Sequence, residues 1–331
     1  FCVGRKMVGA RVRYRSAGKI VDEMEYLNSL NFHQINIADD LFTANKNHCN
    51  AVCDEIIKRG LQLKWTSFAR VDTVSDAVLA KMKAAGCSAV SFGIESADPQ
   101  ILKTIKKGIT LKQVEDAVAM CRRAGIMPFA SFILGLPGET PQTIKETMEF
   151  GNRLKKQGLS FGFHLLAPFP GTEVRENSER YGIKILTDDW SQYHANRAIV
   201  ETPSVDHRTL DEIVVKWEQE YDDYLADIKV RMAENKASRE EIWEIQNLER
   251  IVLLYDLMMK NVIEQKGFWS HEGRPVSLQN NLKILTERIC PSVDTGPEML
   301  FDALHHALQQ GNLKCTDLNG NIRWQWVDFL N

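Results

Sequence analysis

The sequence predicts an α/β fold with parallel strands, on three observations. Between residues 34 and 166, short β-branched runs alternate with longer helical patterns. The unit recurs every ~25 to 40 residues, as in strand–helix–strand units with right-handed crossovers. No GxGxxG follows the first strand, and unusual residues gather at the strand ends. A barrel, complete or incomplete, is therefore favoured over a dinucleotide-binding sheet.

The elements follow from local patterns. Five strands are expected, at Gln34 to Ala38, Gln62 to Phe68, Ala89 to Ile94, Met127 to Leu134 and Ser160 to Leu166. Helices are expected near residues 16–30, 44–59, 75–85, 98–124 and 140–157. Four of them end at a glycine, the usual left-handed C-cap, namely Gly60, Gly86, Gly125 and Gly158.

Helix starts are marked as well. Asp98-Pro99 and Thr140-Pro141 each place a capping side chain before a first-turn proline. Thr110 with Gln113 forms a capping box inside the 98–124 segment.

The pattern changes beyond Pro203. Residues 206–232, 238–267 and 298–310 are expected to be helical, and no strong β period is visible. We therefore expect a first domain over residues 1–205 and a mainly helical C-terminal domain over residues 206–331. The sequence does not indicate what this second domain does.

Composition narrows the function classes. A net charge of −3 over 331 residues argues against a general nucleic-acid or membrane-surface binder. No apolar run is long enough for a transmembrane helix. The seven scattered cysteines indicate reduced thiols rather than a disulfide scaffold, so a cytoplasmic protein is expected.

Several motifs stand at strand ends. The chain opens with Phe1-Cys2, and Asp39-Asp40-Leu41-Phe42-Thr43 follows the first expected strand. Asp40 or Thr43 suits a helix cap, and a neighbouring carboxylate suits an ammonium group.

The next two strands end in charged residues. Ser67-Phe68-Ala69-Arg70 offers a fixed guanidinium fork suited to a carboxylate. Glu95 ends the apolar run Ser91-Phe92-Gly93-Ile94, and Lys106-Lys107-Gly108 follows it. A charged residue in that place favours a site over a structural role.

The last two strands carry the longest motifs. Ser131-Phe132-Ile133-Leu134-Gly135 leads into Leu136-Pro137-Gly138-Glu139. This strand is apolar apart from the small residues Ser131 and Gly135. The final motif is His164-Leu165-Leu166-Ala167-Pro168-Phe169-Pro170-Gly171-Thr172, in which His164 equally suits a core position.

In this order the motifs resemble the radical S-adenosylmethionine (SAM) enzymes, in particular their cobalamin-associated branch, which is related to methylthiotransferase-type cores. The resemblance covers roughly residues 1 to 200. It implies a partial (β/α)6 TIM-like barrel whose first strand lies upstream of Phe1. It also implies a 4Fe–4S cluster with Cys2 as a ligand, since thiolates are the usual ligands of such clusters. The SAM contacts that it implies are Phe1, Asp39, Asp40, Ser67, Arg70, Glu95, Ser131, Ile133, Gly135, His164 and Leu166.

The chain departs from this family pattern at its start. The family holds its cluster with three cysteines, and only Cys2 stands in the matching place. Cys49 and Cys53 share one helical face and are better explained as buried thiols than as cluster ligands. We therefore expect an N-terminally truncated chain, and cobalamin would belong to an upstream domain.

The resemblance implies an enzyme that reductively cleaves SAM to a 5′-deoxyadenosyl radical and methylates, cyclises or rearranges an unreactive carbon centre. A small-molecule substrate and an electron donor such as a ferredoxin or flavodoxin would be its partners. Three alternatives stay open. They are a tRNA-modifying radical SAM enzyme, a catalytically silent barrel without its cluster, and an aldolase-type barrel, which would need a strand-end lysine that the five strands lack.

Overall fold

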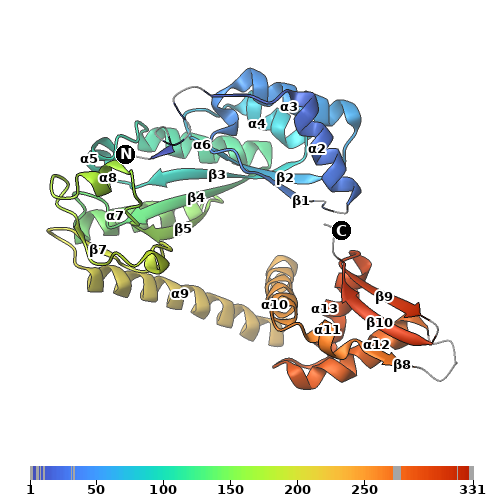
Figure 1. Cartoon of the computed structure of the whole chain (residues 1–331). Helices are drawn as coiled ribbons and strands as arrows, with labels where there is room; N and C mark the ends of the chain where they lie inside the picture. The colour runs from blue at the N-terminus through green and yellow to red at the C-terminus, as the bar shows by residue number, and fades with distance from the viewer. Residues whose placement is uncertain are drawn as a thin grey trace. The chain divides into compact units, whose positions relative to one another are not determined.

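The computed structural model describes residues 12–30, 34–270, 277–318 and 320–327, together with Val3, Gly4, Met7, Gly9 and Phe32. It divides into two compact units, Phe1–Glu218 and Gln219–Asn331 (Figure 1). The sequence predicted a boundary at residue 205. The long helix α9 (His207–Ala233) runs through that region and contributes to both units.

The first unit is built around a five-stranded parallel sheet in the order β1-β2-β3-β4-β5. The strands are β1 (Gln34–Ile37), β2 (Lys64–Ala69), β3 (Cys87–Glu95), β4 (Met127–Leu134) and β5 (Ser160–Leu165). Every strand lies beside its neighbour in the sequence, which confirms the predicted parallel α/β architecture. The predicted strand ends differ from these by at most two residues.

Helices connect the strands. They are α2 (Ala17–Ser29), η1 (Phe42–Ala44), α3 (Lys46–Arg59), α4 (Asp76–Ala84), α5 (Pro99–Thr104), α6 (Leu111–Ala124) and α7 (Pro141–Lys155). The segment predicted as one helix over 98–124 is two helices, because the chain turns between them with positive φ at Lys106 and Gly108. The predicted capping box of Thr110 and Gln113 opens the second of these helices.

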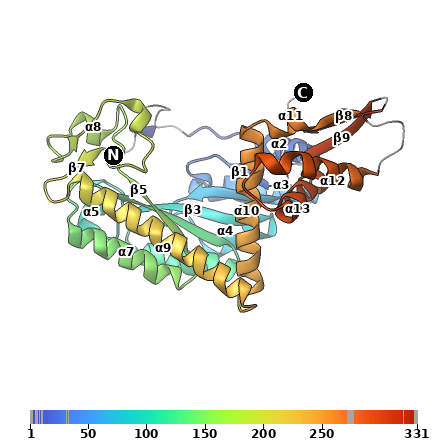
Figure 2. The same ribbon diagram turned by 90° about the horizontal axis from the view of Figure 1, so that it is seen from below.

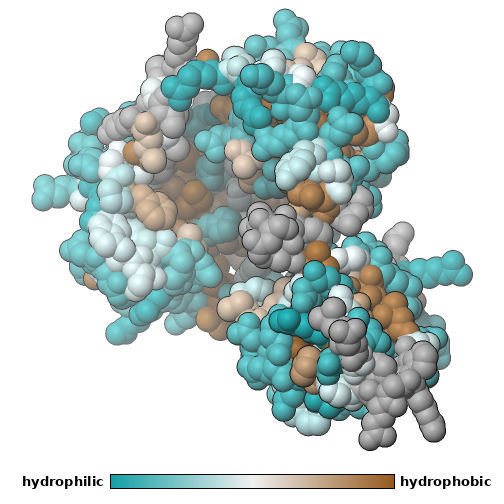
Figure 3. All heavy atoms as spheres, turned by 45° about the vertical axis from the view of Figure 1, so that its right-hand side comes forward, coloured by the Kyte–Doolittle hydropathy of each residue, from teal (hydrophilic) through white to brown (hydrophobic). Residues whose placement is uncertain are grey.

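One face of the sheet is covered by helices. Trp65, Phe92 and Phe132 point into a core that also holds residues of α2, α3, α4, α6 and α7. Figure 1 shows α2, α3, α4 and α6 along this side. Alternate strand residues point to the other face, where Phe68 and Phe129 stay exposed. Figure 3 shows hydrophobic side chains set back in a hollow of a largely hydrophilic surface.

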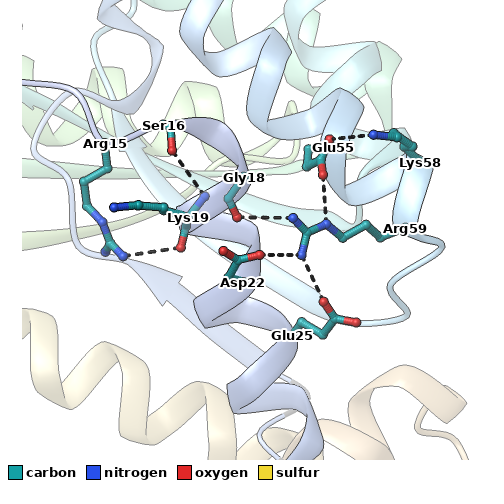
Figure 4. Close-up of polar contacts among 9 residues, drawn as sticks. All are labelled: Arg15, Ser16, Gly18, Lys19, Asp22, Glu25, Glu55, Lys58 and Arg59. Carbon is teal, nitrogen blue, oxygen red and sulfur yellow. Dashed lines mark hydrogen bonds and ion pairs between the residues drawn. The ribbon is translucent and has the colours of Figure 1, made fainter.

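An ion-pair network joins α2 to α3 at the sheet's β1 end (Figure 4). The guanidinium group of Arg59 donates to Asp22 (2.7 Å), Glu25 (3.0 Å) and Glu55 (2.9 Å). It also donates to the carbonyl oxygen of Gly18 at 3.4 Å. The last turn of α3 is thereby held against the face of α2 that carries Gly18, Asp22 and Glu25.

Short elements follow β5 before α9 begins. They are α8 (Glu173–Glu176), β6 (Lys184–Ile185), η2 (Trp190–Gln192) and β7 (Val200–Glu201). Leu210 of α9 packs with Ile144 of α7 and Leu165 of β5 in a small core of its own. Figure 2 shows α9 running alongside α7.

The second unit combines helices with a small antiparallel sheet. Its elements are α10 (Arg239–Met259), α11 (Val262–Lys266), β8 (Phe268–Ser270), α12 (Leu278–Ile289), η3 (Cys290–Ser292), α13 (Pro297–Gln309), β9 (Leu313–Leu318) and β10 (Asn321–Trp326). The strands pair in the order β8-β10-β9, which the sequence did not reveal. Trp324 of β10 lies in the unit's core. None of the helices among the described residues is long and apolar enough to cross a bilayer.

Candidate functional site at the carboxyl ends of the strands

A cavity of about 360 Å³ opens at the carboxyl ends of β1 to β4. The carboxyl ends of parallel strands meet at one edge of a sheet, so side chains far apart in the sequence converge there. Three predicted site residues line the cavity, namely Asp40, Arg70 and Ser131. The remaining lining residues are Leu41, Phe68, Ala69, Ser91, Gly93 and Lys107.

The two aspartates after β1 have different surroundings. Asp39 accepts a hydrogen bond from the backbone N–H of Leu41 at 2.9 Å, which fixes the turn, and Asp40 lines the cavity. Neither Asp40 nor Thr43 caps the next helix. Asn45 caps α3, because its side chain accepts from two backbone N–H groups at 3.1 Å. The cap explanation of Asp40 is therefore wrong, and its carboxylate is available to the cavity.

Arg70 is held in place by Asp72. Its Nε and one terminal nitrogen donate to the two carboxylate oxygens at 3.0 and 2.9 Å. This bidentate hydrogen bond, more than any other contact, lowers the pKa of Asp72 below its usual range. The guanidinium group is thus preorganised where it lines the cavity.

Glu95 pairs with Lys107, a residue that the sequence analysis quoted without assigning it a role. Lys107 Nζ lies 2.7 Å from Glu95 Oε1, and each side chain is less than one-fifth exposed. Glu95 has a left-handed backbone (φ 75°), next to a register shift between β3 and β4. Gly93 leaves room for the pair, because a Cβ there would come within 2.6 Å of Glu95 Oε1. The only sequence signal for Lys107 was its place in Lys106-Lys107-Gly108, the motif that follows Glu95.

The end of β4 is fixed by a buried carboxyl group. Glu139 Oε2 accepts from the backbone N–H groups of Gly135 (2.5 Å) and Leu136 (3.1 Å). Burial raises the pKa of Glu139 to about 8. Ser131 and Ile133 lie on the less buried face of the same strand. The sequence analysis placed Glu139 in a turn motif and missed that it anchors this segment.

Other predicted site residues lie elsewhere. Ser67 points to the helix-covered face, where its hydroxyl is buried with no hydrogen-bond partner among the described residues. It therefore does not join the strand-end cavity. Leu166 is buried and donates its N–H to the carbonyl of Leu134 at 2.9 Å. His164 lines a second cavity, of about 320 Å³, along β5 and α9.

The cysteines give no cluster within the described part of the chain. Phe1 and Cys2, the predicted start of the cluster site, lie outside the described residues. Cys49 and Cys53 are buried in α3, and the pKa of Cys53 is raised, first by its hydrogen bond with Cys49 and then by burial. No group of three His, Cys, Asp or Glu side chains among the described residues is placed to hold a metal ion.

Comparison with known proteins relates the chain to one superfamily. Residues 1–151 match the family model described as "Radical SAM superfamily". An uncharacterized methyltransferase of Pyrococcus horikoshii is 35% identical over 195 residues, which are 58% of this chain and 42% of that protein. An anaerobic magnesium-protoporphyrin IX monomethyl ester cyclase of Rubrivivax gelatinosus is 27% identical over 203 residues, which are 60% of this chain and 35% of the cyclase. The chain thus spans less than half of either relative.

A solved structure shows the same fold. The cobalamin-dependent SAM radical enzyme OxsB, with aqua-cobalamin and SAM bound, superposes with a TM-score of 0.51 at 17% identity. The match covers 92% of this chain and 51% of OxsB. At this identity the likeness supports the fold. The resemblance inferred from the strand-end motifs is confirmed by the family match.

Proposed function

Because residues 1–151 match the family model of the radical SAM superfamily, we propose that the first unit of the chain is the SAM-binding core of a radical SAM enzyme. The whole protein would reductively cleave SAM at a 4Fe–4S cluster and use the 5′-deoxyadenosyl radical to methylate, cyclise or rearrange an unreactive carbon. The substrate would be a small molecule, and a ferredoxin or flavodoxin would deliver the electron. Cobalamin would be held outside the described residues.

The observation that carries this proposal is the set of charges in the strand-end cavity. SAM has an ammonium group, a carboxylate and an adenine ring. Asp40 supplies a carboxylate for the ammonium group, and Arg70 supplies a preorganised cation for the carboxylate. Ser131, on β4, leaves a shallow strand surface on which adenine would lie. The residues present therefore fit SAM.

The protein's share of the chemistry is to bind, orient and exclude water. A 4Fe–4S cluster, when bound, would supply the electron needed to cleave SAM. Cys2 is the residue that we propose as one of its ligands, with Phe1 beside it. Glu95 and Lys107 would keep the third strand's end rigid beside SAM, since the pair is largely buried and mutually neutralised.

We further propose that β1 to β5 are five units of a partial (β/α)6 barrel. The strands follow one another in chain order, and helices cover one face only, as a barrel wall requires.

The test is anaerobic reconstitution of the natural protein that contains this chain, followed by measurement of bound iron and of 5′-deoxyadenosine. We expect about four irons per cluster and SAM cleavage that requires a reductant. Asp40→Asn should lower SAM cleavage by about tenfold or more through weaker SAM binding. Asp54→Asn, in the exposed ion pair with Lys81, is the matched control and should leave it unchanged.

Two outcomes would overturn the proposal. A protein that takes up iron but never cleaves SAM would be a silent scaffold. Unchanged cleavage in the Asp40 variant would show that the strand-end cavity does not bind the ammonium group.

A further inference from the structure

We propose that helix α9 carries a hinge at residues 218–227, where it opens locally and allows the two units of the chain to reorient. We call these residues the linking segment. The boundary between the units falls between Glu218 and Gln219, inside a single helix rather than in a loop. Figure 2 shows α9 as one unbroken helix. A hinge at this place would exist whether or not the first unit binds SAM.

The half of α9 that precedes the linking segment is anchored on the first unit. Leu210 is fully buried in the small core that α9 shares with α7 and β5. The carboxylate of Asp211 accepts a hydrogen bond from the N–H of Ala198 at 2.9 Å. The ring of Trp217 meets that of Phe163 edge-on, with the ring centroids 5.9 Å apart. These contacts hold the helix to the first unit as far as Trp217.

The half that follows the linking segment is anchored on α10. The side chain of Ile228 is fully buried. Lys229 Nζ lies 2.7 Å from Glu249 Oε1, and a terminal nitrogen of Arg231 lies 2.8 Å from Glu241 Oε1. Both acidic partners belong to α10. Burial and ion pairs therefore hold α9 within the second unit from Ile228 onward.

Between Trp217 and Ile228, no residue of α9 is buried. Nine of the ten residues of the linking segment are exposed, and the tenth, Leu225, is partly buried. Helices in proteins are stabilised mainly by the packing of one face, and isolated helices shorter than about 12 to 15 residues are marginal in water. The helical state of the linking segment therefore depends on its own sequence.

The charges of the linking segment oppose a helix. It contains no lysine or arginine and five acidic residues, which are Glu218, Glu220, Asp222, Asp223 and Asp227. Residues three or four apart are neighbours on a helix surface, where like charges repel. Two acidic pairs lie four residues apart, Glu218 with Asp222 and Asp223 with Asp227. A third pair, Glu220 with Asp223, lies three residues apart.

Two contacts along α9 oppose this repulsion in part. Gln219 Nε2 donates to Asp223 at 2.9 Å, and Arg231 Nε donates to Asp227 at 2.8 Å. Among the described residues, no ion pair neutralises Glu218 or Asp222. The repulsion between these two residues is therefore the one that a single substitution can reverse.

Opening the linking segment leaves few groups unsatisfied. Its residues are exposed, so the N–H and C=O groups that opening frees would bind water. Aspartate favours the N-cap of a helix over its interior, because its side chain accepts from N–H groups of the first turn. Asp206 does this at the start of α9, where it accepts from the N–H of Thr209 at 2.8 Å. Asp222 or Asp223 would cap the second half of an opened α9 in the same way.

The first experiment is amide hydrogen exchange of the full chain, followed by mass spectrometry of peptides from α9. The readout is the protection factor, which is the exchange rate of the unfolded chain divided by the measured rate. We expect residues 220–227 to be less protected than residues 211–217 and 228–233 by about tenfold or more.

Asp222→Lys tests the electrostatic cause. It replaces the repulsion of Glu218 with an attraction to a lysine four residues later, in the favourable order along the helix. Protection of the linking segment should rise about twofold to fivefold. Glu212→Lys is the matched control, because it makes the same change of charge at an exposed position in the anchored first half. It should leave the protection of the linking segment unchanged.

Salt separates charge repulsion from other causes of opening. In about 1 M sodium chloride the Debye length is about 3 Å, so the repulsion is screened and protection of the linking segment should rise in wild type. It should rise less in Asp222→Lys, because the same salt also screens the new attraction.

Reorientation of the units is measured with a nitroxide label on Gln279→Cys, at an exposed position of α12, in a chain whose accessible cysteines are replaced by serine. Paramagnetic relaxation falls steeply with distance, so it detects orientations that are populated only a small part of the time. We expect relaxation at amides of the first unit that no single orientation of the second unit reproduces.

Three results would overturn the proposal. They are equal protection along the whole of α9, equal protection of the linking segment in wild type and Asp222→Lys, and paramagnetic relaxation that one fixed orientation of the units explains.

Discussion

At the scale of single residues, the strand-end cavity is shaped by ion pairs that hold their own members still. Arg70 is paired with Asp72, and Lys107 is paired with Glu95. An arginine held by a bidentate carboxylate has lost its side-chain freedom before a ligand arrives, so binding costs less ordering. This preorganisation separates Arg70 from an ordinary surface arginine.

Replacing Arg70 with glutamine should weaken binding of S-adenosylhomocysteine, the uncharged-sulfur analogue of SAM, by about tenfold or more. The cation for the ligand's carboxylate is lost, and Asp72 is left unpaired beside it. Isothermal titration calorimetry measures the affinity. Arg153→Gln is the matched control. Arg153 lies on the surface of α7, where it pairs with Glu115 of α6, and it does not line the strand-end cavity. Equal affinity of Arg70→Gln and wild type would contradict the carboxylate role.

Glu139 makes stability depend on pH. Its pKa is raised from 4.5 to about 8 in the folded chain. A carboxyl group with a raised folded pKa contributes most below its unfolded pKa, and the contribution is lost as the pH rises through the folded pKa. The free energy of unfolding should therefore fall between about pH 4.5 and 8, by at most about 1.4 kcal/mol per pH unit.

Two variants isolate this effect. Both backbone donors bind the same oxygen, Oε2, so the neutral acid carries its proton on Oε1. Glutamine reproduces that arrangement, and Glu139→Gln should remain stable and lose this part of the pH dependence. Glu139→Ala leaves two buried amides unpaired and should cost about 2–4 kcal/mol. Urea unfolding between pH 5 and 8 measures the free energy of unfolding of wild type and of both variants. If this free energy changed with pH in the same way in wild type and Glu139→Gln, the pH dependence would not come from Glu139.

At the scale of elements, helix α7 packs closely on β5. Gly151 lies inside α7, and a Cβ at this position would come within 2.9 Å of the Phe161 ring. That ring cannot move away freely, because it packs edge-on against Phe132 and Phe163. The glycine therefore sets the distance between α7 and β5.

Gly151→Ala should destabilise the protein by about 1–3 kcal/mol, although alanine is the better helix former. Gly18→Ala in α2 is the matched control, since its Cβ would have only Arg59 nearby, at 3.8 Å. It should be neutral or stabilising by up to about 1 kcal/mol. Urea unfolding midpoints compare the stability of the two variants with that of wild type. If Gly151→Ala were more stable than wild type, the Phe161 ring must move aside for the added Cβ.

At the scale of the whole molecule, each unit has its own hydrophobic core. Trp65 lies in the core of the first unit and Trp324 in that of the second, and both are buried. Separate cores unfold separately unless their interface couples them. The proposed SAM site belongs to the first unit only.

Saturating S-adenosylhomocysteine should therefore stabilise the first unit alone, by about 2.7 kcal/mol at a hundred times its dissociation constant. Trp324→Phe and Trp65→Phe assign the fluorescence changes of a denaturant titration to the two units. The unfolding transition reported by Trp65 should shift to higher denaturant concentration when the ligand is present. The transition reported by Trp324 should stay where it is. Transitions that coincide and move together would show that α9 couples the two units.

Much of the first unit was predictable because its signals are local. Strand β4 was predicted at its observed bounds, and the glycines expected to close helices, such as Gly60 and Gly125, have the left-handed backbone that a C-cap needs. The break between α5 and α6 was missed, because Thr110 caps the second helix inside an otherwise continuous pattern. The small sheet of the second unit was missed because its strands are short and its helices dominate the periodicity.

By itself, the sequence determined that strand ends carry the chemistry, because β/α alternation brings the carboxyl ends of parallel strands to one edge. It could not determine which face of the sheet the helices cover. Ser67 and Arg70 lie three residues apart and so point to opposite faces, and only the packing of the helices shows that Ser67 enters the core while Arg70 lines the cavity. Only the tertiary structure brought Lys107 to Glu95, and Trp217 of α9 to Phe163 of β5, because those contacts depend on how separate segments pack.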